Sequence, residues 1–259
     1  MPEGDTVHRS AKAMHRALAG RTLKRTDFRV PQLATTDLVG SSITEVVARG
    51  KHMLTRTDDG WTLHTHFKME GSWHLYRTGE RWQGLEWQVR VVLETDPFIA
   101  VGFQLAIVDL IRTVDEEDSL GHLGPDILGP DWDLDEAMSR ITSDPGREIG
   151  DALFDQRNVA GIGNLYLNET LYLRGIHPRT LVSNTPQLDD ILLLAKRLMT
   201  ANIGHSIQTT TGNKRLSDKH WVFERPGHYC RRCGTPVEVS RQGEFRRLIY
   251  WCPGCQPAE

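Results

Sequence analysis

Residues 153–169 read LFDQRNVAGIGNLYLNE, and the turn Gly161-Ile162-Gly163-Asn164 at their centre lies between segments with helical patterning. We expect helices at about 146–157 and 161–174 around this turn. Glycines let the backbone approach a ligand closely, and amides at the start of a helix can face a phosphate. Together with further expected helices at 133–142 and 187–203, the stretch predicts a helical unit with an anion-binding turn.

The chain before this helical region alternates apolar and polar residues in short segments, which is typical of antiparallel strands. Asp5 can cap a helix that ends near Ala19, with Gly20 as its stop signal. Strands are expected at 22–30, 43–49, 52–57, 61–67, 71–76, 87–94 and 99–111. The segment therefore predicts an antiparallel sandwich or barrel behind an N-terminal helix.

All four cysteines lie in the last 30 residues, as Cys230-x2-Cys233 and Cys252-x2-Cys255. Each pair can supply two thiolates from one tight turn, and the intervening hairpin can bring the two turns together around a tetrahedral zinc ion. Two disulfides or four free thiols are the alternatives, and the cytosolic location expected from the absence of a secretion signal disfavours disulfides. The spacing predicts one structural zinc site.

These segments predict an α+β fold with a two-layered antiparallel β-sandwich, a flanking N-terminal helix, a helical domain and a four-cysteine zinc-finger β-hairpin. Glycine and proline cluster at 121–132, which indicates a linker. The expected domains are residues 1–120, the linker 121–132, the helical domain 133–225 and the zinc finger 226–259.

Charge is segregated along the chain. The 31 Lys and Arg against 34 Asp and Glu give a net charge of −3, which on average disfavours a polyanionic partner. However, residues 94–155 hold 16 acidic and three basic residues, so the remaining segments carry a balance of +10. We expect a basic cleft for nucleic acid and an acidic far surface, with residues 115–118 (DEED) as solvated surface.

No run of about 18 apolar residues occurs, and the N-terminus MPEGDTVHR lacks the regions of a secretion signal. These absences predict a cytosolic protein without a membrane partner.

Six ordered segments resemble the formamidopyrimidine-DNA glycosylase/endonuclease VIII family of bifunctional base-excision repair enzymes. They are PEGD at 2–5, RGKHML at 49–54, HFKMEGSW at 66–73, HLGPDIL at 122–128, residues 153–169, and CRRCG…YWCPGCQ at 230–256. The chain is most similar to the actinobacterial group of the endonuclease VIII branch. The resemblance implies damaged double-stranded DNA as partner, with single-stranded and bubble DNA left open, and a monomer in the bacterial cytoplasm at the nucleoid.

The resemblance also implies roles for individual residues. Removal of Met1 would leave Pro2 with a free secondary amine, and an α-amino group is neutral more often than a lysine near neutral pH. Pro2 matches the nucleophile that attacks C1′ of a flipped nucleotide, and Glu3 matches the acid/base. Lys51, the third expected catalytic residue, matches a lysine that contacts the phosphate beside the lesion.

Further DNA contacts are implied in both halves of the chain. Asn164 lies in the glycine turn that matches the family's helix–two-turn–helix element. Arg247 matches the arginine that clamps phosphates from the zinc hairpin, with Arg246 as its competitor. Met69 matches the residue that fills the gap left by the flipped base, and a core methionine is the alternative.

Three features bear on the choice between activities. His64, His66 and His74 alternate on strands without a fourth ligand, so they are interpreted as surface or core histidines. The segment 98–106 lacks the Arg-Arg-Phe wedge of the purine-specific branch, and 205–229 is short for a purine-capping loop, which favours oxidised pyrimidines. The expected activity is a glycosylase and lyase with β-elimination and also δ-elimination; the alternatives are an oxidised-purine glycosylase and a non-catalytic DNA- or RNA-binding zinc protein.

Overall fold

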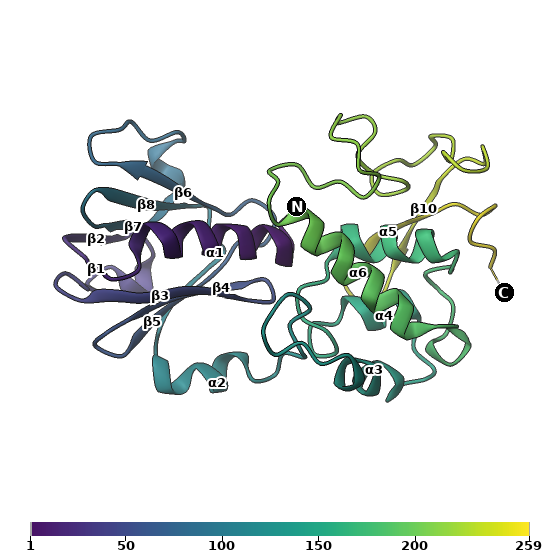
Figure 1. The fold of residues 1–259 in the computed structure, drawn as a ribbon, viewed down its shortest axis with the longest axis horizontal. Helices are drawn as coiled ribbons and strands as arrows, with labels where there is room; N and C mark the ends of the chain where they lie inside the picture. Colours follow the sequence, from purple (N-terminus) through teal and green to yellow (C-terminus); the bar gives the residue numbers. More distant parts are fainter. Residues whose placement is uncertain (1, 259) are drawn as a thin grey trace. The chain divides into compact units, whose positions relative to one another are not determined.

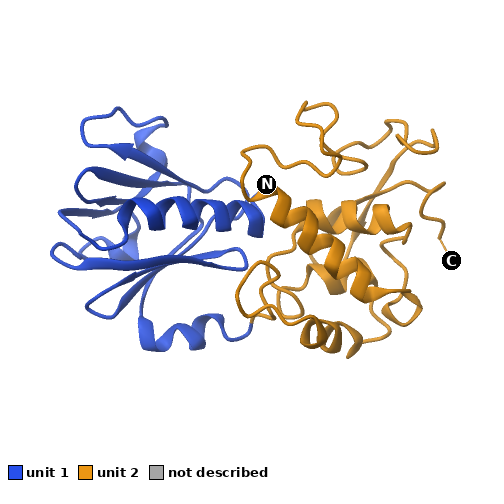
Figure 2. Cartoon of the chain, in the orientation of Figure 1, with its two compact units in different colours: residues 1–122 blue, residues 123–259 orange. Residues whose placement is uncertain are grey.

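The computed structural model describes residues 2–258, and the chain divides into two compact units between His122 and Leu123 (Figure 2). Unit 1 ends at His122 and unit 2 begins at Leu123. Across the described residues, no helix combines the length and the apolar character that a membrane span requires.

Unit 1 contains two antiparallel sheets and two helices (Figure 1). The five-stranded sheet has the order β1 (Arg21–Thr22), β3 (Ser42–Arg49), β4 (His52–Thr57), β5 (Trp61–His66) and β9 (Ile107–Arg112). The four-stranded sheet has the order β2 (Arg25–Phe28), β7 (Val89–Glu94), β8 (Phe98–Phe103) and β6 (Ser72–Arg77). The helices are α1 (Gly4–Leu18) and the short α2 (Glu116–Leu120).

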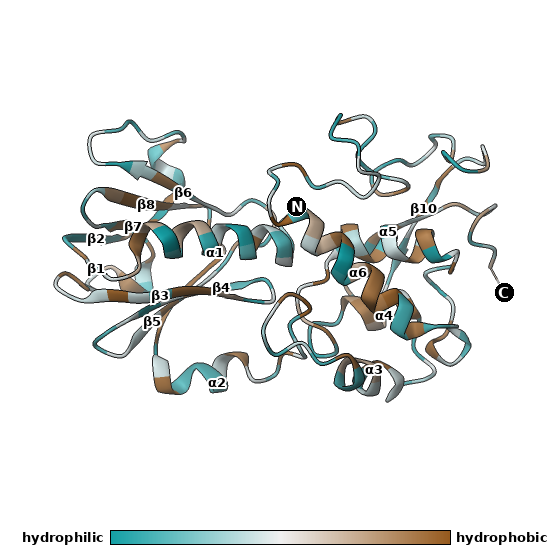
Figure 3. Cartoon of the chain, viewed as in Figure 1, coloured by the Kyte–Doolittle hydropathy of each residue, from teal (hydrophilic) through white to brown (hydrophobic). Residues whose placement is uncertain are grey.

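Apolar side chains from both sheets and from α1 form one shared core. Val46 and Met53 enter it from the five-stranded sheet, and Val91 and Ala100 enter it from the four-stranded sheet. The expected two-layered sandwich with a flanking helix is therefore confirmed. Figure 3 shows the hydrophobic residues along the strands of this unit.

Helix α1 forms because its apolar residues recur on one face. Val7, Ala11, Met14 and Leu18 are all at most 2% exposed, and burying a large apolar side chain of this kind contributes about 1.5–3 kcal/mol. The N-cap is Glu3 rather than Asp5, which lies inside the first turn and is itself buried. The expected cap at Asp5 is therefore wrong by two residues.

Two strands that the alternation predicts as continuous are broken where the chain changes sheet. The expected strand 22–30 divides into β1 and β2, which belong to different sheets. The expected strand 99–111 divides into β8 and β9 at Gln104, whose φ of 48° no strand adopts. Alternation gives the buried face of each strand, but it does not show which sheet the strand joins.

The acidic segment 115–118 is exposed at Asp115, Glu117 and Asp118, as expected for solvated surface, and only Glu116 is half-buried. Glu116, at the start of α2, accepts hydrogen bonds from Arg56 at 2.6 and 2.7 Å and from Thr62 Oγ1 at 2.6 Å. The Arg56 and Thr62 contacts lower the pKa of Glu116 against the opposing effect of burial. Glu116 therefore fixes α2 to the outer face of the five-stranded sheet.

Unit 2 contains four helices and a two-stranded antiparallel hairpin. The helices are α3 (Leu134–Thr142), α4 (Ile149–Phe154), α5 (Asn164–Arg174) and α6 (Leu188–Asn202), and the hairpin strands are β10 (Glu238–Gln242) and β11 (Arg247–Trp251). Their apolar faces share one core that also contains Cys230 and Cys252. The structure thus contains the expected helical domain and hairpin.

The helices around the glycine turn are shorter than expected. Helix α4 ends at Phe154, because Asp155 leaves the helical region and binds Arg147 and Arg157 at 2.9 and 2.7 Å. The two arginines hold the pKa of Asp155 well below its usual range. Helix α5 begins at Asn164 rather than at Gly161, whose φ of 104° is outside the helical region.

The segment expected as a linker is partly packed into unit 2. Leu123 and Ile127 are at most 3% exposed, and Asp126 pairs with Ala160 in an isolated parallel bridge. Helix α6 begins after Gln187 as its N-cap.

Candidate active site and metal centre

The expected nucleophile and acid/base lie at the start of α1. Pro2 is half-buried, and Glu3 is 1% exposed although it is acidic. The Glu3 carbonyl accepts hydrogen bonds from Thr6 N at 3.0 Å and Val7 N at 3.1 Å, which fixes its backbone as the N-cap. The helix dipole favours a carboxylate at this position. Met1, whose removal was expected, lies outside the described residues.

Lys51 lies on the two-residue turn that joins β3 to β4. Arg49 pairs directly with His52 across the turn, and Gly50 has a φ of 58°, the positive value that such a tight hairpin requires. The turn therefore presents Lys51 at the end of the β3–β4 ladder.

Met69 is 66% exposed on the loop that follows β5, and this exposure rules out the alternative of a core methionine. The loop is tight because Gly71 N donates to Phe67 O at 2.9 Å, and Phe67 is itself buried. A Cβ on Gly71 would lie 2.5 Å from Phe67 O, so only glycine fits there. The buried Phe67 and the tight turn hold the loop in place, and the loop presents the apolar side chain of Met69 to solvent.

His64 and His66 lie beside a third histidine, His52, whereas His74 lies in the other sheet. His64 and His66 lie on β5 near His52 of β4, with His52 Nδ1 2.8 Å from His64 Nε2. His74 is exposed on β6, where it hydrogen-bonds Ser72 at 3.1 Å. His52 could not be grouped with these histidines from the sequence, because it lies on a different strand and approaches them only when β4 and β5 pair.

In unit 2, Asn164 is the first residue of α5 and is tied to the zinc hairpin. Its Nδ2 donates to Leu248 O at 2.8 Å. Asn168, one turn later, donates to Asn164 O at 2.5 Å and accepts from Tyr250 N at 2.7 Å. The start of α5 and strand β11 therefore form one connected structure.

Arg247 is the first residue of β11, and its guanidinium is held by two groups. It forms an ion pair with Asp151 of α4 and lies 3.8 Å from the ring centroid of Phe154. Burial lowers the pKa of Arg247 and Asp151 opposes this effect, while Arg247 Nε is buried without a hydrogen-bond partner. The guanidinium of Arg247 is therefore held in one orientation by a carboxylate and an aromatic ring.

Arg246, its competitor, lies in the hairpin turn with a φ of 47° and an exposed side chain. Of these two arginines, Arg247 is the one oriented by an acidic partner and an aromatic ring. The contrast supports Arg247 as the expected clamp.

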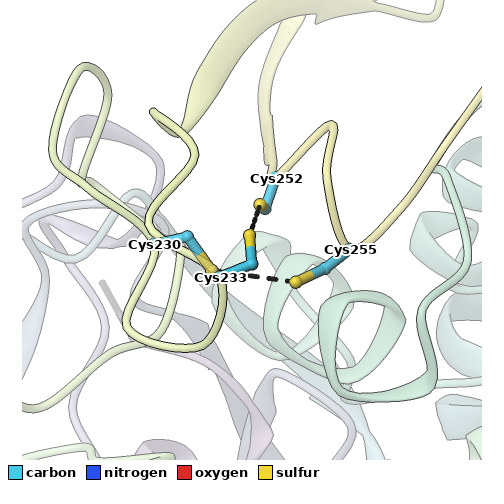
Figure 4. A group of neighbouring side chains, drawn as sticks. All are labelled: Cys230, Cys233, Cys252 and Cys255. Atoms are coloured by element: carbon cyan, nitrogen blue, oxygen red, sulfur yellow. Dashed lines mark hydrogen bonds between the residues drawn. The ribbon is translucent and has the colours of Figure 1, made fainter.

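The four cysteines converge as the spacing predicts (Figure 4). All four Sγ atoms lie within 4.8 Å of one another, with Cys230 to Cys255 at 3.8 Å and Cys233 to Cys252 at 3.4 Å. Tetrahedral zinc with Zn–S bonds of about 2.3 Å places its sulfur ligands about 3.8 Å apart. No disulfide joins these residues. Among the described residues, only this group brings three or more potential ligand atoms together for a metal ion.

The surroundings lower the pKa of Cys230 and Cys233, whereas burial raises the pKa of Cys252 and Cys255. Tyr172 OH lies 3.2 Å from Cys230 Sγ, and hydrogen bonds from Thr235 lower the pKa of Cys233 to about 6. The four-thiolate donor set, its spacing and its closed geometry fit a structural ion and leave no position for a substrate.

Glu169 of α5 is a structural residue that sequence reasoning missed. Its buried carboxylate accepts hydrogen bonds from Thr210 Oγ1 and from the backbone N–H groups of Trp221, Val222 and Phe223. Burial raises the pKa of Glu169, and these four donors oppose the rise. Glu169 thus anchors the segment that precedes the zinc hairpin. The signal in the sequence was an acidic residue within the largely apolar helix NLYLNETLYLR.

Two family domains match this chain. Residues 1–114 match the formamidopyrimidine-DNA glycosylase N-terminal domain, and residues 123–213 match the formamidopyrimidine-DNA glycosylase H2TH domain. The chain therefore belongs to the formamidopyrimidine-DNA glycosylase family.

Relatives that resemble it over its full length include endonuclease 8 proteins of actinobacteria. A probable endonuclease 8 2 of Streptomyces coelicolor is 46% identical over 99% of this chain and 94% of its own length. The DNA-(apurinic or apyrimidinic site) lyase Nei2 of Mycolicibacterium smegmatis is 41% identical over all of both chains. An endonuclease 8 of Escherichia coli is 31% identical over 99% of this chain and 100% of its own length.

Solved structures agree on the fold. A Lactococcus lactis Fpg in complex with DNA that contains an abasic site has a TM-score of 0.83 at 20% identity, covering 99% of this chain and 100% of that chain. At this identity the likeness concerns the fold alone.

Proposed function

We propose that this protein is a bifunctional DNA glycosylase and abasic-site lyase of base excision repair that removes oxidised pyrimidines. The observation that carries the proposal is the Pro2-Glu3 start of α1, with Glu3 1% exposed, in a chain of this family. The relatives named endonuclease 8 and Nei2 support the same activity.

In the proposed reaction, the neutral secondary amine of Pro2 attacks C1′ of the flipped nucleotide. The base leaves with the electrons of its bond to C1′ and takes up a proton, and the nitrogen of Pro2 gives up its own. Protonation of the sugar ring oxygen opens the ring and leaves an iminium between Pro2 N and C1′. The positive nitrogen withdraws electrons, so a C2′ proton is lost and the 3′ phosphate leaves with the electrons of its C–O bond. A second elimination would release the 5′ phosphate, and water then hydrolyses the iminium and frees Pro2.

Glu3 is proposed to carry protons in this sequence. Its acid form would give a proton to the ring oxygen, and its carboxylate could then accept the C2′ proton. Glu3 is adjacent to Pro2 in the chain and belongs to the same helix terminus, so both groups are fixed by one element.

Lys51, Asn164 and Arg247 are proposed as phosphate contacts and Met69 as the wedge. Asn164 carries two N–H donors and gives one to Leu248 O. Arg247 has a guanidinium oriented by Asp151 and Phe154, and Met69 is 66% exposed. Damaged double-stranded DNA is accordingly the proposed partner of a monomer in the bacterial cytoplasm, and the sites on each unit support it separately.

Arg247→Ala is expected to weaken binding to an abasic-site duplex about tenfold and to reduce the slope of log Kd against log salt by about 1, because one phosphate contact is lost. The matched variant Arg246→Ala removes the same charge from an exposed neighbour and should leave both quantities within about twofold of the parent. Fluorescence anisotropy at several salt concentrations measures them. A larger effect of Arg246→Ala would reverse the assignment.

We further propose that Cys230, Cys233, Cys252 and Cys255 hold one structural zinc ion. The ion would neutralise the thiolates and fix the hairpin that carries Arg247. Removal by a strong chelator is expected to release one equivalent of zinc and to lower DNA affinity at least about tenfold, because the hairpin loses its constraint. Metal analysis with a zinc-sensitive dye measures the release. Retention of full affinity by a zinc-free protein would contradict this role.

The lesion preference separates the proposal from its closest alternative. Strand β8 occupies the segment where the purine-specific branch has its wedge, and no Arg-Arg-Phe occurs there. Duplexes with thymine glycol or 5,6-dihydrouracil should be cleaved at least about tenfold faster than a duplex with 8-oxoguanine, which corresponds to about 1.4 kcal/mol. A preference for 8-oxoguanine would favour a purine glycosylase, and no cleavage of any duplex would favour a non-catalytic nucleic-acid binder.

A further inference from the structure

A row of polar side chains runs along the outer face of the five-stranded sheet to the Lys51 turn. Leu63 of β5 enters the core, so His64 and His66, one and three residues further along the strand, lie on the opposite face. His52, the residue after Lys51, pairs with His66 across the ladder, and His64 pairs with Asp109 of β9. Three strands therefore contribute to this His52 row, which we define as His52, His64, His66 and Asp109.

The contacts within the row link its members. Asp109 Oδ2 lies 4.0 Å from His64 Nδ1, so a carboxylate stands near the far nitrogen of the His64 ring. His64 Nε2 lies 2.8 Å from His52 Nδ1, and one of these two nitrogens donates a hydrogen bond to the other. The ring of His52 is thus held by a hydrogen bond to the neighbouring strand β5.

The same row reaches the loop that carries Met69. The rings of His52 and His66 meet edge to face, with centroids 4.6 Å apart. His66 Nδ1 accepts the Lys68 N–H at 2.9 Å, one residue before Met69. His52 therefore contacts His66, which holds the Met69 loop, and it directly follows Lys51 in the chain.

The three histidines of the row are uncharged at neutral pH. Burial, followed by the charges of His66, His64, His122 and Lys51, lowers the pKa of His52 to about 3. Burial also lowers the pKa of His66 to about 4, with Lys51 and Lys68 adding to the effect, and it lowers the pKa of His64. Neutral histidines add no positive charge that would repel the ammonium group of Lys51.

We propose that His52 is a positioning residue: held by His64 and Asp109, it fixes the Gly50-Lys51 turn for phosphate binding and couples that turn to the Met69 loop. The inference rests on the proposed DNA-binding role of Lys51. His52 itself makes no bond to the substrate and takes no part in the chemistry at Pro2.

A double-mutant cycle on the full-length protein tests this role, with a duplex that carries a tetrahydrofuran abasic analogue as the probe. His52→Leu should weaken binding about tenfold, while His52→Leu in a Lys51→Ala background should add less than about twofold. His52→Asn places an amide, which can donate or accept, where Nδ1 lies, so it can keep the hydrogen bond to His64 and should restore binding to within about twofold of the parent. His74→Leu, which removes an exposed histidine from β6, serves as the matched control and should have no effect.

Each outcome bears on the proposal. Additive effects of the two substitutions, equal losses in His52→Leu and His52→Asn, or unchanged binding would overturn it. Borohydride trapping of the parent with a natural abasic site is run in parallel, because a missing adduct there contradicts the proposed function and not the positioning role. Amide hydrogen exchange of Gly50 and Lys51 in the free protein reports directly on the turn. The exchange rate should be at least about fivefold faster than in the parent for His52→Leu, and unchanged for His52→Asn. Equal exchange rates in the parent and His52→Leu would overturn the proposal.

Discussion

A chain with a Gly-Ser dipeptide fused ahead of Pro2 is expected to lose strand cleavage at abasic sites by at least about 10³-fold, or about 4 kcal/mol of transition-state stabilisation. The reason is that the secondary amine becomes a tertiary amide, whose nitrogen lone pair is delocalised and cannot attack C1′. Gel analysis of an end-labelled duplex measures the rate.

The extension should leave DNA affinity within about fivefold of the parent, because the proposed phosphate contacts, Lys51, Asn164 and Arg247, lie elsewhere in the chain. Its thermal unfolding should be unchanged within error, since the core positions of α1 begin at Val7. A fused chain that still cleaves at the parent rate would exclude Pro2 as the nucleophile.

Glu3→Gln is expected to reduce removal of an oxidised pyrimidine by at least about 10²-fold to 10⁴-fold, which is the usual contribution of general acid–base catalysis. The substitution keeps the size of the side chain and its ability to hydrogen-bond, so the start of α1 should remain folded. Single-turnover kinetics on a duplex with 5,6-dihydrouracil measures the loss. The matched variant Glu70→Gln, which alters an exposed carboxylate on the Met69 loop, should retain the parent rate.

The same Glu3→Gln variant should lose less activity on a preformed abasic site, where no base has to leave. Equal rates for Glu3→Gln and the parent on both substrates would remove Glu3 from the mechanism. A loss that Glu70→Gln shares would instead indicate a general electrostatic effect of charge removal.

Much of unit 1 could be predicted because its signals are local. The apolar face of α1 and most strand positions follow from residues within one element, and those faces are buried as expected. The points near Leu23 and Gln104 where the chain passes from one sheet to the other could not be predicted, because a strand's partner depends on contacts far away in the sequence. The role of Glu116 was missed for the same reason, since Arg56 lies 60 residues away.

The candidate site divides in a similar way. The cysteines and the Lys51 turn are defined by short spacings, and the sequence predicts their local geometry correctly. The partners of these residues are distant: Asp151 lies 96 residues from Arg247, and Leu248 lies 84 residues from Asn164. Such partners orient the side chains, and only the folded chain reveals them.

The measurement that tests the central claim most directly is borohydride trapping with an abasic-site oligonucleotide, followed by proteolysis and mass spectrometry of the cross-linked peptide. The account predicts a reduced covalent adduct on the N-terminal peptide, at the nitrogen of Pro2, with Met1 absent. An adduct on a lysine such as Lys51, or no adduct from a chain whose free N-terminal proline has been verified, would contradict it.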